Sequence, residues 1–184
     1  MSTKIYIALN VTEPGPLKGK YHWALALPRP EFNYRLDKPL DLYQSVFSDE
    51  TDSWVADHRV GPDALSVANI PEFMFLVQLP SINVSFDDVS KFLQLEEPTQ
   101  GSTPLCQERD EWSCAQWVIR TLQSIMRNGW FTATPRGSLD DRDAYYRYIC
   151  RTNGLTCEVT LSARSNNPQF VGQVVNKVRI MDRQ

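Results

Sequence analysis

Two short stretches of the 184-residue chain carry residue types that could perform thiol chemistry. Cys114 follows Ser113 at the expected start of a helix, within WSCAQWV, and His22 stands at the start of an expected strand, within YHWALAL. Unpaired backbone N–H groups and the positive dipole end at a helix N-terminus favour a thiolate. An imidazole held opposite can take up the thiol proton and later return it. The two stretches therefore predict a nucleophilic cysteine with a histidine base.

A third polar side chain is expected to orient the imidazole by accepting a hydrogen bond from its second nitrogen. Gln44 fits this role best, because it lies on a neighbouring expected strand with its side chain on a definite face. Asp41 and Asp57 are alternatives. The predicted catalytic set is therefore Cys114, His22 and Gln44.

Residues flanking this set are the predicted substrate contacts. An acidic run lies directly before the cysteine and could attract a cationic group of a substrate. Trp112 and Tyr21 are close neighbours of the nucleophile and the base. The predicted contacts are Glu108, Asp110, Glu111, Trp112 and Tyr21.

The remaining histidine and cysteines are given other roles. His58, in the polar stretch ADHR, is interpreted as a surface residue. Cys106 lies in the loop before Cys114 and could be a redox neighbour, whereas Cys150 and Cys157 are interpreted as structural. The cysteine spacings do not match zinc ligands, and two histidines are too few for an obvious site. We expect no metal and no cofactor.

Periodicity predicts the elements that must hold these residues. Alternating or continuous apolar residues predict strands over 4–10, 21–27, 40–47, 53–60 and 73–79. Helical spacing predicts helices from about 86 to 95, 113 to 128 and 139 to 153, and a short strand over 157–161. The expected class is α+β, with an antiparallel sheet of about five strands packed on helices. We expect one domain over 1–184, with a core over 4–130 and a C-terminal extension over 131–184.

Composition and charge narrow the function classes. The chain is 42% hydrophobic and 22% charged, as in ordinary globular proteins. It has neither a signal-peptide pattern nor an apolar run of about 18 residues, so we expect a cytoplasmic protein without a membrane span. Residues 1–112 hold 9 Lys and Arg against 17 Asp and Glu, whereas residues 113–184 hold 10 against 5, mostly arginine. That basic half could face an anionic partner such as tRNA.

The two motifs also carry a family resemblance over about residues 4–130. HWAL on a strand, followed far downstream by SCAQWV at a helix start, resembles the circularly permuted papain-like, NlpC-type thiol fold. Lecithin retinol acyltransferase and its relatives are of this kind, and a set of uncharacterised fungal proteins with HWAL and CxxWV motifs is more similar still. The resemblance implies Cys114 as nucleophile, His22 as base and Gln44 where the family often has histidine. Ser113 replaces the family's asparagine.

Such a site would form an acyl-thioester on Cys114 and pass the acyl group on. We favour a biosynthetic acyl or aminoacyl transferase. The most specific hypothesis is a fungal cyclodipeptide synthase of secondary metabolism, which would use aminoacyl-tRNA to make arginine-containing cyclic dipeptides. Two alternatives stay open: a cysteine amidase or peptidase of NlpC type, and a non-catalytic binding module on the same scaffold. The sequence does not name the acyl donor, the acceptor or the oligomeric state.

Overall fold

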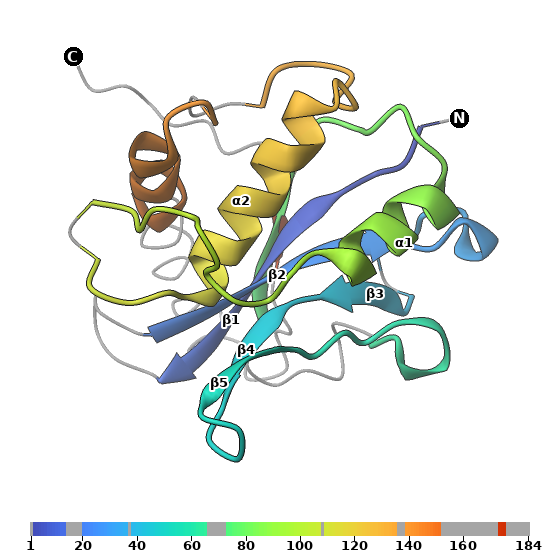
Figure 1. Cartoon of the computed structure of the whole chain (residues 1–184). Helices are drawn as coiled ribbons and strands as arrows, with labels where there is room; N and C mark the ends of the chain where they lie inside the picture. Colours follow the sequence, from blue (N-terminus) through green and yellow to red (C-terminus); the bar gives the residue numbers. More distant parts are fainter. Residues whose placement is uncertain are drawn as a thin grey trace, which may run out of the picture.

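The computed structural model describes residues 2–13, 20–36, 38–65, 73–107, 109–135, 139–151 and 173–175. The fold is α+β, with a twisted sheet crossed by helices (Figure 1). The strand order of the main sheet is β3-β2-β1-β6-β7, with four antiparallel strands and β7 running parallel to β6. Its strands are β1 (Tyr6–Glu13), β2 (Lys20–Pro28), β3 (Leu40–Tyr43), β6 (Phe73–Gln78) and β7 (Gln173–Val175).

The expected strand over 40–47 divides at Gln44. Its first part is β3 of the main sheet, and its second part, β4 (Ser45–Ser48), forms a separate two-stranded sheet with β5 (Ser53–Ala56). The expected fourth strand over 53–60 therefore lies outside the main sheet and is shorter than predicted. Short 3-10 turns occur at η1 (Pro30–Phe32) and η2 (Gly61–Asp63).

The helices begin where the sequence provides caps. The Ser85 hydroxyl accepts from the Asp88 N–H at the start of α1 (Phe86–Leu95). Ser113 accepts from the Gln116 N–H at 3.4 Å and caps α2 (Cys114–Arg127). These two predicted helices are confirmed, and residues 142–151 are also helical. The predicted strand over 157–161 lies outside the described residues.

The two faces of the main sheet differ in character because side chains alternate along each strand. The larger core lies between the sheet and α2, which crosses it diagonally (Figure 1). Smaller side chains dominate the opposite face. The first face includes Trp23, Leu25 and Leu27 with Trp117 and Leu122, and the second includes Ala24, Ala26, Leu40, Leu42 and Leu76.

The core extends past residue 130, where the sequence places its boundary. Leu139, Tyr145 and Ile149 are buried in the same cluster as α2. The Gln123 side chain donates to the carbonyl of Leu139 at 2.9 Å, so α2 also holds the start of this segment. The chain after 130 thus supplies part of the core as well as β7.

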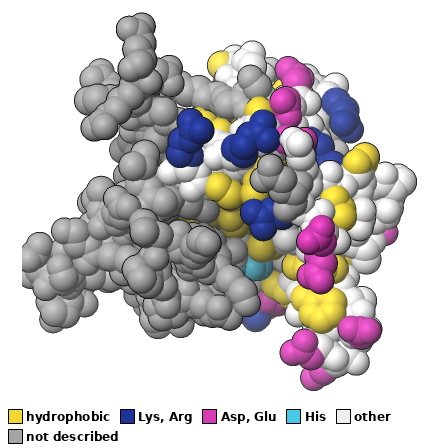
Figure 2. Space-filling model, turned by 90° about the vertical axis from the view of Figure 1, so that its left-hand side faces the viewer, with side chains coloured by type: hydrophobic (Ala, Val, Ile, Leu, Met, Phe, Trp, Pro, Cys, Tyr) yellow, Lys and Arg dark blue, Asp and Glu magenta, His cyan; other side chains and the backbone are white. Residues whose placement is uncertain are grey.

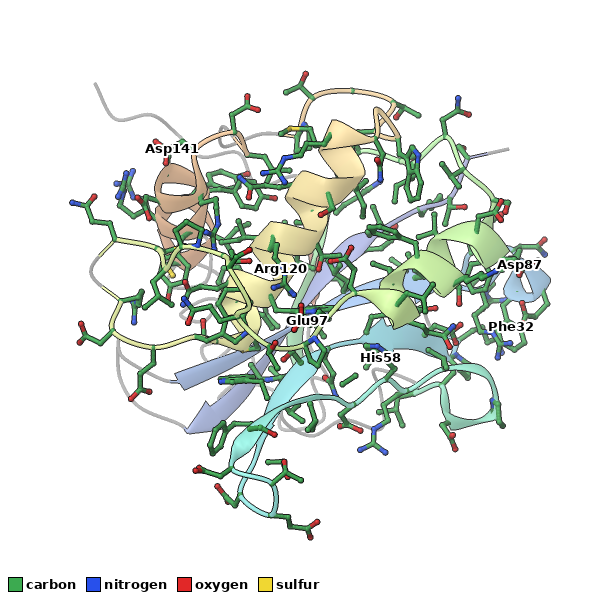
Figure 3. All side chains as sticks on the ribbon, in the orientation of Figure 1. Phe32, His58, Asp87, Glu97, Arg120 and Asp141 are labelled. Atoms are coloured by element: carbon green, nitrogen blue, oxygen red, sulfur yellow. The ribbon has the colours of Figure 1, made fainter. Side chains whose placement is uncertain are left out.

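An arginine of α2 holds part of the connection between α1 and α2. The Arg120 guanidinium donates to the carbonyls of Glu97, Thr99 and Gln100 and lies 5.0 Å from the centre of the Trp112 ring. Arg120 and Glu97 are labelled near the middle of the molecule in Figure 3. The loop is therefore packed beside the N-terminal part of α2. Within the described ranges, no helix has the length and apolar character needed to span a membrane.

Candidate active site

The Cys114 thiol lies at the edge of β2, at the first residue of α2. Its Sγ accepts a hydrogen bond from the backbone N–H of Trp23 at 3.4 Å. That N–H can donate to sulfur because β3 pairs with β2 only over Leu25–Pro28. Two backbone bonds, together about 2.9 Å, separate the Trp23 nitrogen from the His22 Cα. The sulfur therefore lies within about 6 Å of that Cα.

Burial controls the protonation of this thiol. Cys114 is 9% exposed, and its burial raises the pKa of the thiol above the ordinary value. The N–H groups of Trp23, Ala115 and Cys114 itself oppose that shift by hydrogen bonding. The expectation of a preformed thiolate at the helix N-terminus is therefore wrong in direction, because desolvation outweighs the N–H groups. Nucleophilic attack from this site needs a base.

His22 is held by a chain of two side chains. Its Nε2 lies 2.9 Å from Oε1 of Gln44, and the Gln44 amide nitrogen donates to Oδ2 of Asp57 at 3.0 Å. An ionised carboxylate only accepts, so Asp57 fixes which end of the amide faces His22. The amide oxygen then requires a proton on His22 Nε2 and leaves Nδ1 as the acceptor nitrogen. In the neutral ring, Nδ1 is the atom able to take a thiol proton.

The structure separates the three candidates for the third residue. Gln44 touches the imidazole, and Asp57 stands behind Gln44. Asp41 is buried elsewhere, where it accepts from the Gly61 N–H and lies 3.7 Å from Nε of Arg29. Asp41 is therefore not part of this group.

Thiol and imidazole reach the edge of β2 from opposite sides of the sheet. Alternation along β2 places His22 on the face of Ala24, and Gln44 follows Leu42 on that same face. Cys114 belongs to the core on the α2 face. The part of β2 around Trp23, which no described strand pairs on the side away from β1, is where the two faces meet.

The environment keeps His22 in its basic form. Burial lowers the pKa of His22, and the Gln44 hydrogen bond and the Asp57 charge oppose this without reversing it. A neutral imidazole at pH 7 is the form that accepts a proton.

A stacked aromatic pair lies near the thiol. The Tyr146 ring, from the helical segment 142–151, stacks on Trp23 with 5.9 Å between centroids and 7° between planes. The Arg109 guanidinium lies 4.8 Å from the centre of the Tyr146 ring, and Cys114 contributes to the raised pKa of Tyr146. Figure 2 shows one face on which a histidine side chain and hydrophobic side chains lie between Lys and Arg side chains and acidic side chains.

No family model, curated protein or solved structure matches this chain. The resemblance to the papain-like thiol fold therefore stays a prediction. The case for function rests on the geometry around Cys114 and His22.

The structure places the predicted substrate contacts in different environments. Asp110 and Glu111 are exposed beside the start of α2, whereas Glu108 and the Tyr21 side chain lie outside the described residues. Trp112 is 6% exposed, and its indole N–H donates to the Pro98 carbonyl at 2.9 Å. Trp112 therefore packs within the loop between α1 and α2 and is not among the proposed substrate contacts.

Sequence reasoning missed the role of Gln116. Its buried side chain accepts from the Cys106 N–H at 2.8 Å and donates to the Glu111 carbonyl at 2.7 Å. It thereby fixes the loop that carries the acidic residues. Its place in the first turn of α2, two residues after Cys114, is the signal that could have indicated this contact.

The structure also differs from the interpretation of His58 as a surface residue. It is half-buried, and its Nδ1 accepts from the Gln44 N–H at 3.2 Å. Cys106 is buried and Cys150 is half-buried, while Cys157 lies outside the described residues. Among the described residues, no three His, Cys, Asp or Glu side chains are grouped so that they could hold a metal ion.

Part of the basic C-terminal half is used inside the molecule. Arg120 and Arg142 donate to backbone carbonyls of the loop between α1 and α2. Arg127, Arg147 and Arg151 are exposed. Among the arginines of this half that the structure describes, the exposed ones could face an anionic partner. Retardation of tRNA in a low-salt gel would test that hypothesis, and unretarded tRNA would remove it.

Proposed function

We propose that this protein is a cysteine-dependent acyltransferase, with Cys114 as nucleophile and His22 as base. The observation that carries the proposal is the Trp23 N–H bond to the Cys114 sulfur, next to an imidazole oriented by Gln44 and Asp57. A nucleophile, a base and a group that orients the base are the parts that covalent acyl transfer needs.

The reaction follows from these atoms. His22 Nδ1 takes the thiol proton as Sγ attacks the acyl carbonyl, and backbone N–H groups at the start of α2 stabilise the oxyanion. The carbon–leaving-group bond then breaks, and the leaving group departs with the proton from His22. An acceptor amine or alcohol attacks the thioester, gives its proton to His22, and the thiol is restored as that proton returns to sulfur.

Burial of the thiol favours transfer over hydrolysis. A nucleophile that is only 9% exposed meets little bulk water, so a bound acceptor competes well for the thioester. The exposed Asp110 and Glu111 beside the helix start suit a cationic acceptor or acyl group. An aminoacyl donor, as in the cyclodipeptide synthase hypothesis, fits this charge pattern.

The same burial favours one alternative, a binding module whose cysteine only fills the core. Reaction with 4-nitrophenyl acetate separates these functions. We expect a burst of one 4-nitrophenolate per chain, absent in Cys114→Ala and kept in the matched control Cys106→Ser, whose thiol is also buried.

Adding glycinamide then identifies the acceptor. Formation of N-acetylglycinamide faster than acetate supports a transferase, whereas acetate alone despite glycinamide indicates an amidase or peptidase. No burst, or a burst that survives in Cys114→Ala, contradicts thiol catalysis and leaves the binding module.

A further inference from the structure

The segment that follows β5 binds Gln44 at all its polar groups except the oxygen that faces His22. The Gln44 N–H donates to Nδ1 of His58 at 3.2 Å, and the Gln44 carbonyl accepts from the Asp57 N–H at 3.2 Å. The Gln44 amide nitrogen donates to Asp57 Oδ2 at 3.0 Å. Only Oε1 remains, and it meets His22. The place of Gln44 is thus set from residues 57 and 58.

One register explains why these residues meet. Ser45 pairs with Ala56 in the two-stranded sheet, and Leu42 bridges to Arg59. Both pairs belong to the same antiparallel register, which places Asp57 opposite Gln44 and His58 opposite the preceding residue. Main-chain pairing alone therefore brings the His58 ring next to the break between β3 and β4.

His58 also contacts the helix that carries the nucleophile. Its ring lies 5.5 Å from the Tyr43 ring and 6.2 Å from the Trp117 ring, between centroids. Trp117 is three residues after Cys114 on α2. Figure 3 labels His58 beside β3. The ring thus touches both the strand that leads to Gln44 and the first turn of α2.

The protonation of His58 suits an acceptor role. Because Nδ1 accepts from the Gln44 N–H, the neutral ring must carry its proton on Nε2. That Nε2 is buried, with no hydrogen-bond partner among the described residues. An unpaired buried N–H costs free energy. An apolar ring would fill this space without that cost. The hydrogen bond from the Gln44 N–H to Nδ1 therefore explains why a histidine stands at this position.

We propose that His58 is a positioning residue, which fixes Gln44 and, through it, the His22 imidazole relative to Cys114. This inference rests on the proposed acyl transfer for its catalytic meaning. The competing role is aromatic packing between Tyr43 and Trp117, which needs a ring but no acceptor.

Two substitutions separate positioning from packing. His58→Phe keeps a ring and removes the acceptor, whereas His58→Asn removes the ring and keeps an acceptor oxygen near the place of Nδ1. We expect the burst with 4-nitrophenyl acetate to be roughly tenfold slower in His58→Phe, as for the loss of one hydrogen bond, and nearly unchanged in His58→Asn. A slow His58→Asn with an unaffected His58→Phe would overturn positioning in favour of packing.

Two NMR measurements do not depend on activity. In the wild type, the His58 ring nitrogens should show the tautomer protonated at Nε2, and the other tautomer would contradict the inference even if a variant fails to fold. The pKa of His22 should fall in His58→Phe, because a displaced Gln44 makes a weaker hydrogen bond to His22, and should stay unchanged in His58→Asn. An unchanged His22 pKa in both variants overturns the inference. If the wild type shows no burst, acyl transfer fails while the His22 titration still decides whether His58 positions Gln44.

Discussion

Replacing His22 with alanine is expected to slow acylation of Cys114 by about 10²–10⁴-fold, the usual range for losing a general base. The expected loss is large because burial keeps the Cys114 pKa high, so almost no thiolate forms without a base. The measurement is the rate of the 4-nitrophenolate burst at pH 7.

The control for this prediction is that the His22→Ala variant keeps the wild-type fold. Near-UV circular dichroism and thermal unfolding of His22→Ala should match the wild type closely, since the imidazole lies at the edge of the sheet and is only half-buried. A folded His22→Ala protein that acylates at the wild-type rate would show that His22 is not the base.

The acid limb of the acylation rate is expected below pH 6.5. Burial lowers the pKa of His22, so the ring stays neutral and active to a lower pH than a free imidazole. Below that pKa the rate should fall about tenfold per pH unit, because each unit reduces the neutral fraction tenfold. Gln44→Ala should move the limb to still lower pH, since the hydrogen bond to Gln44 raises the His22 pKa.

The titration of His58 must be distinguished from that of His22 in this pH–rate profile. Burial also lowers the pKa of His58, so the profile is best measured in both the wild type and His58→Asn. A limb above pH 6.5, or an upward shift in Gln44→Ala, would contradict the assigned environment of His22.

Local sequence signals predicted the elements that carry the site. The Ser113 cap and the apolar stripe of α2 depend on neighbours along the chain, so the sequence alone predicts Cys114 in the first turn. Alternation along β2 likewise predicts the face of His22. Gln44 was predicted as the imidazole's partner because adjacent strands place same-face side chains near one another.

Features set by distant packing were not predictable in this way. The raised pKa of Cys114 depends on burial of its thiol in a core cluster that also includes Tyr145 and Ile149, from a segment beyond residue 140. The burial of His58 depends on how residues 53–59 return along residues 42–48, a register that the polar stretch ADHR does not reveal. The strand divides at Gln44 for a similar reason, because β3 pairs with β2 only as far as Tyr43.

The most direct test of the central claim is the mass of the acylated protein. After brief reaction with 4-nitrophenyl acetate and acid quenching, we expect one acetyl group per chain, mapped to the peptide with Cys114 and released by neutral hydroxylamine, as thioesters are. Cys106→Ser should acquire the same group, and Cys114→Ala should acquire none. Acetylation confined to lysines or to another cysteine, with an unmodified Cys114, would contradict a thiol nucleophile at the start of α2.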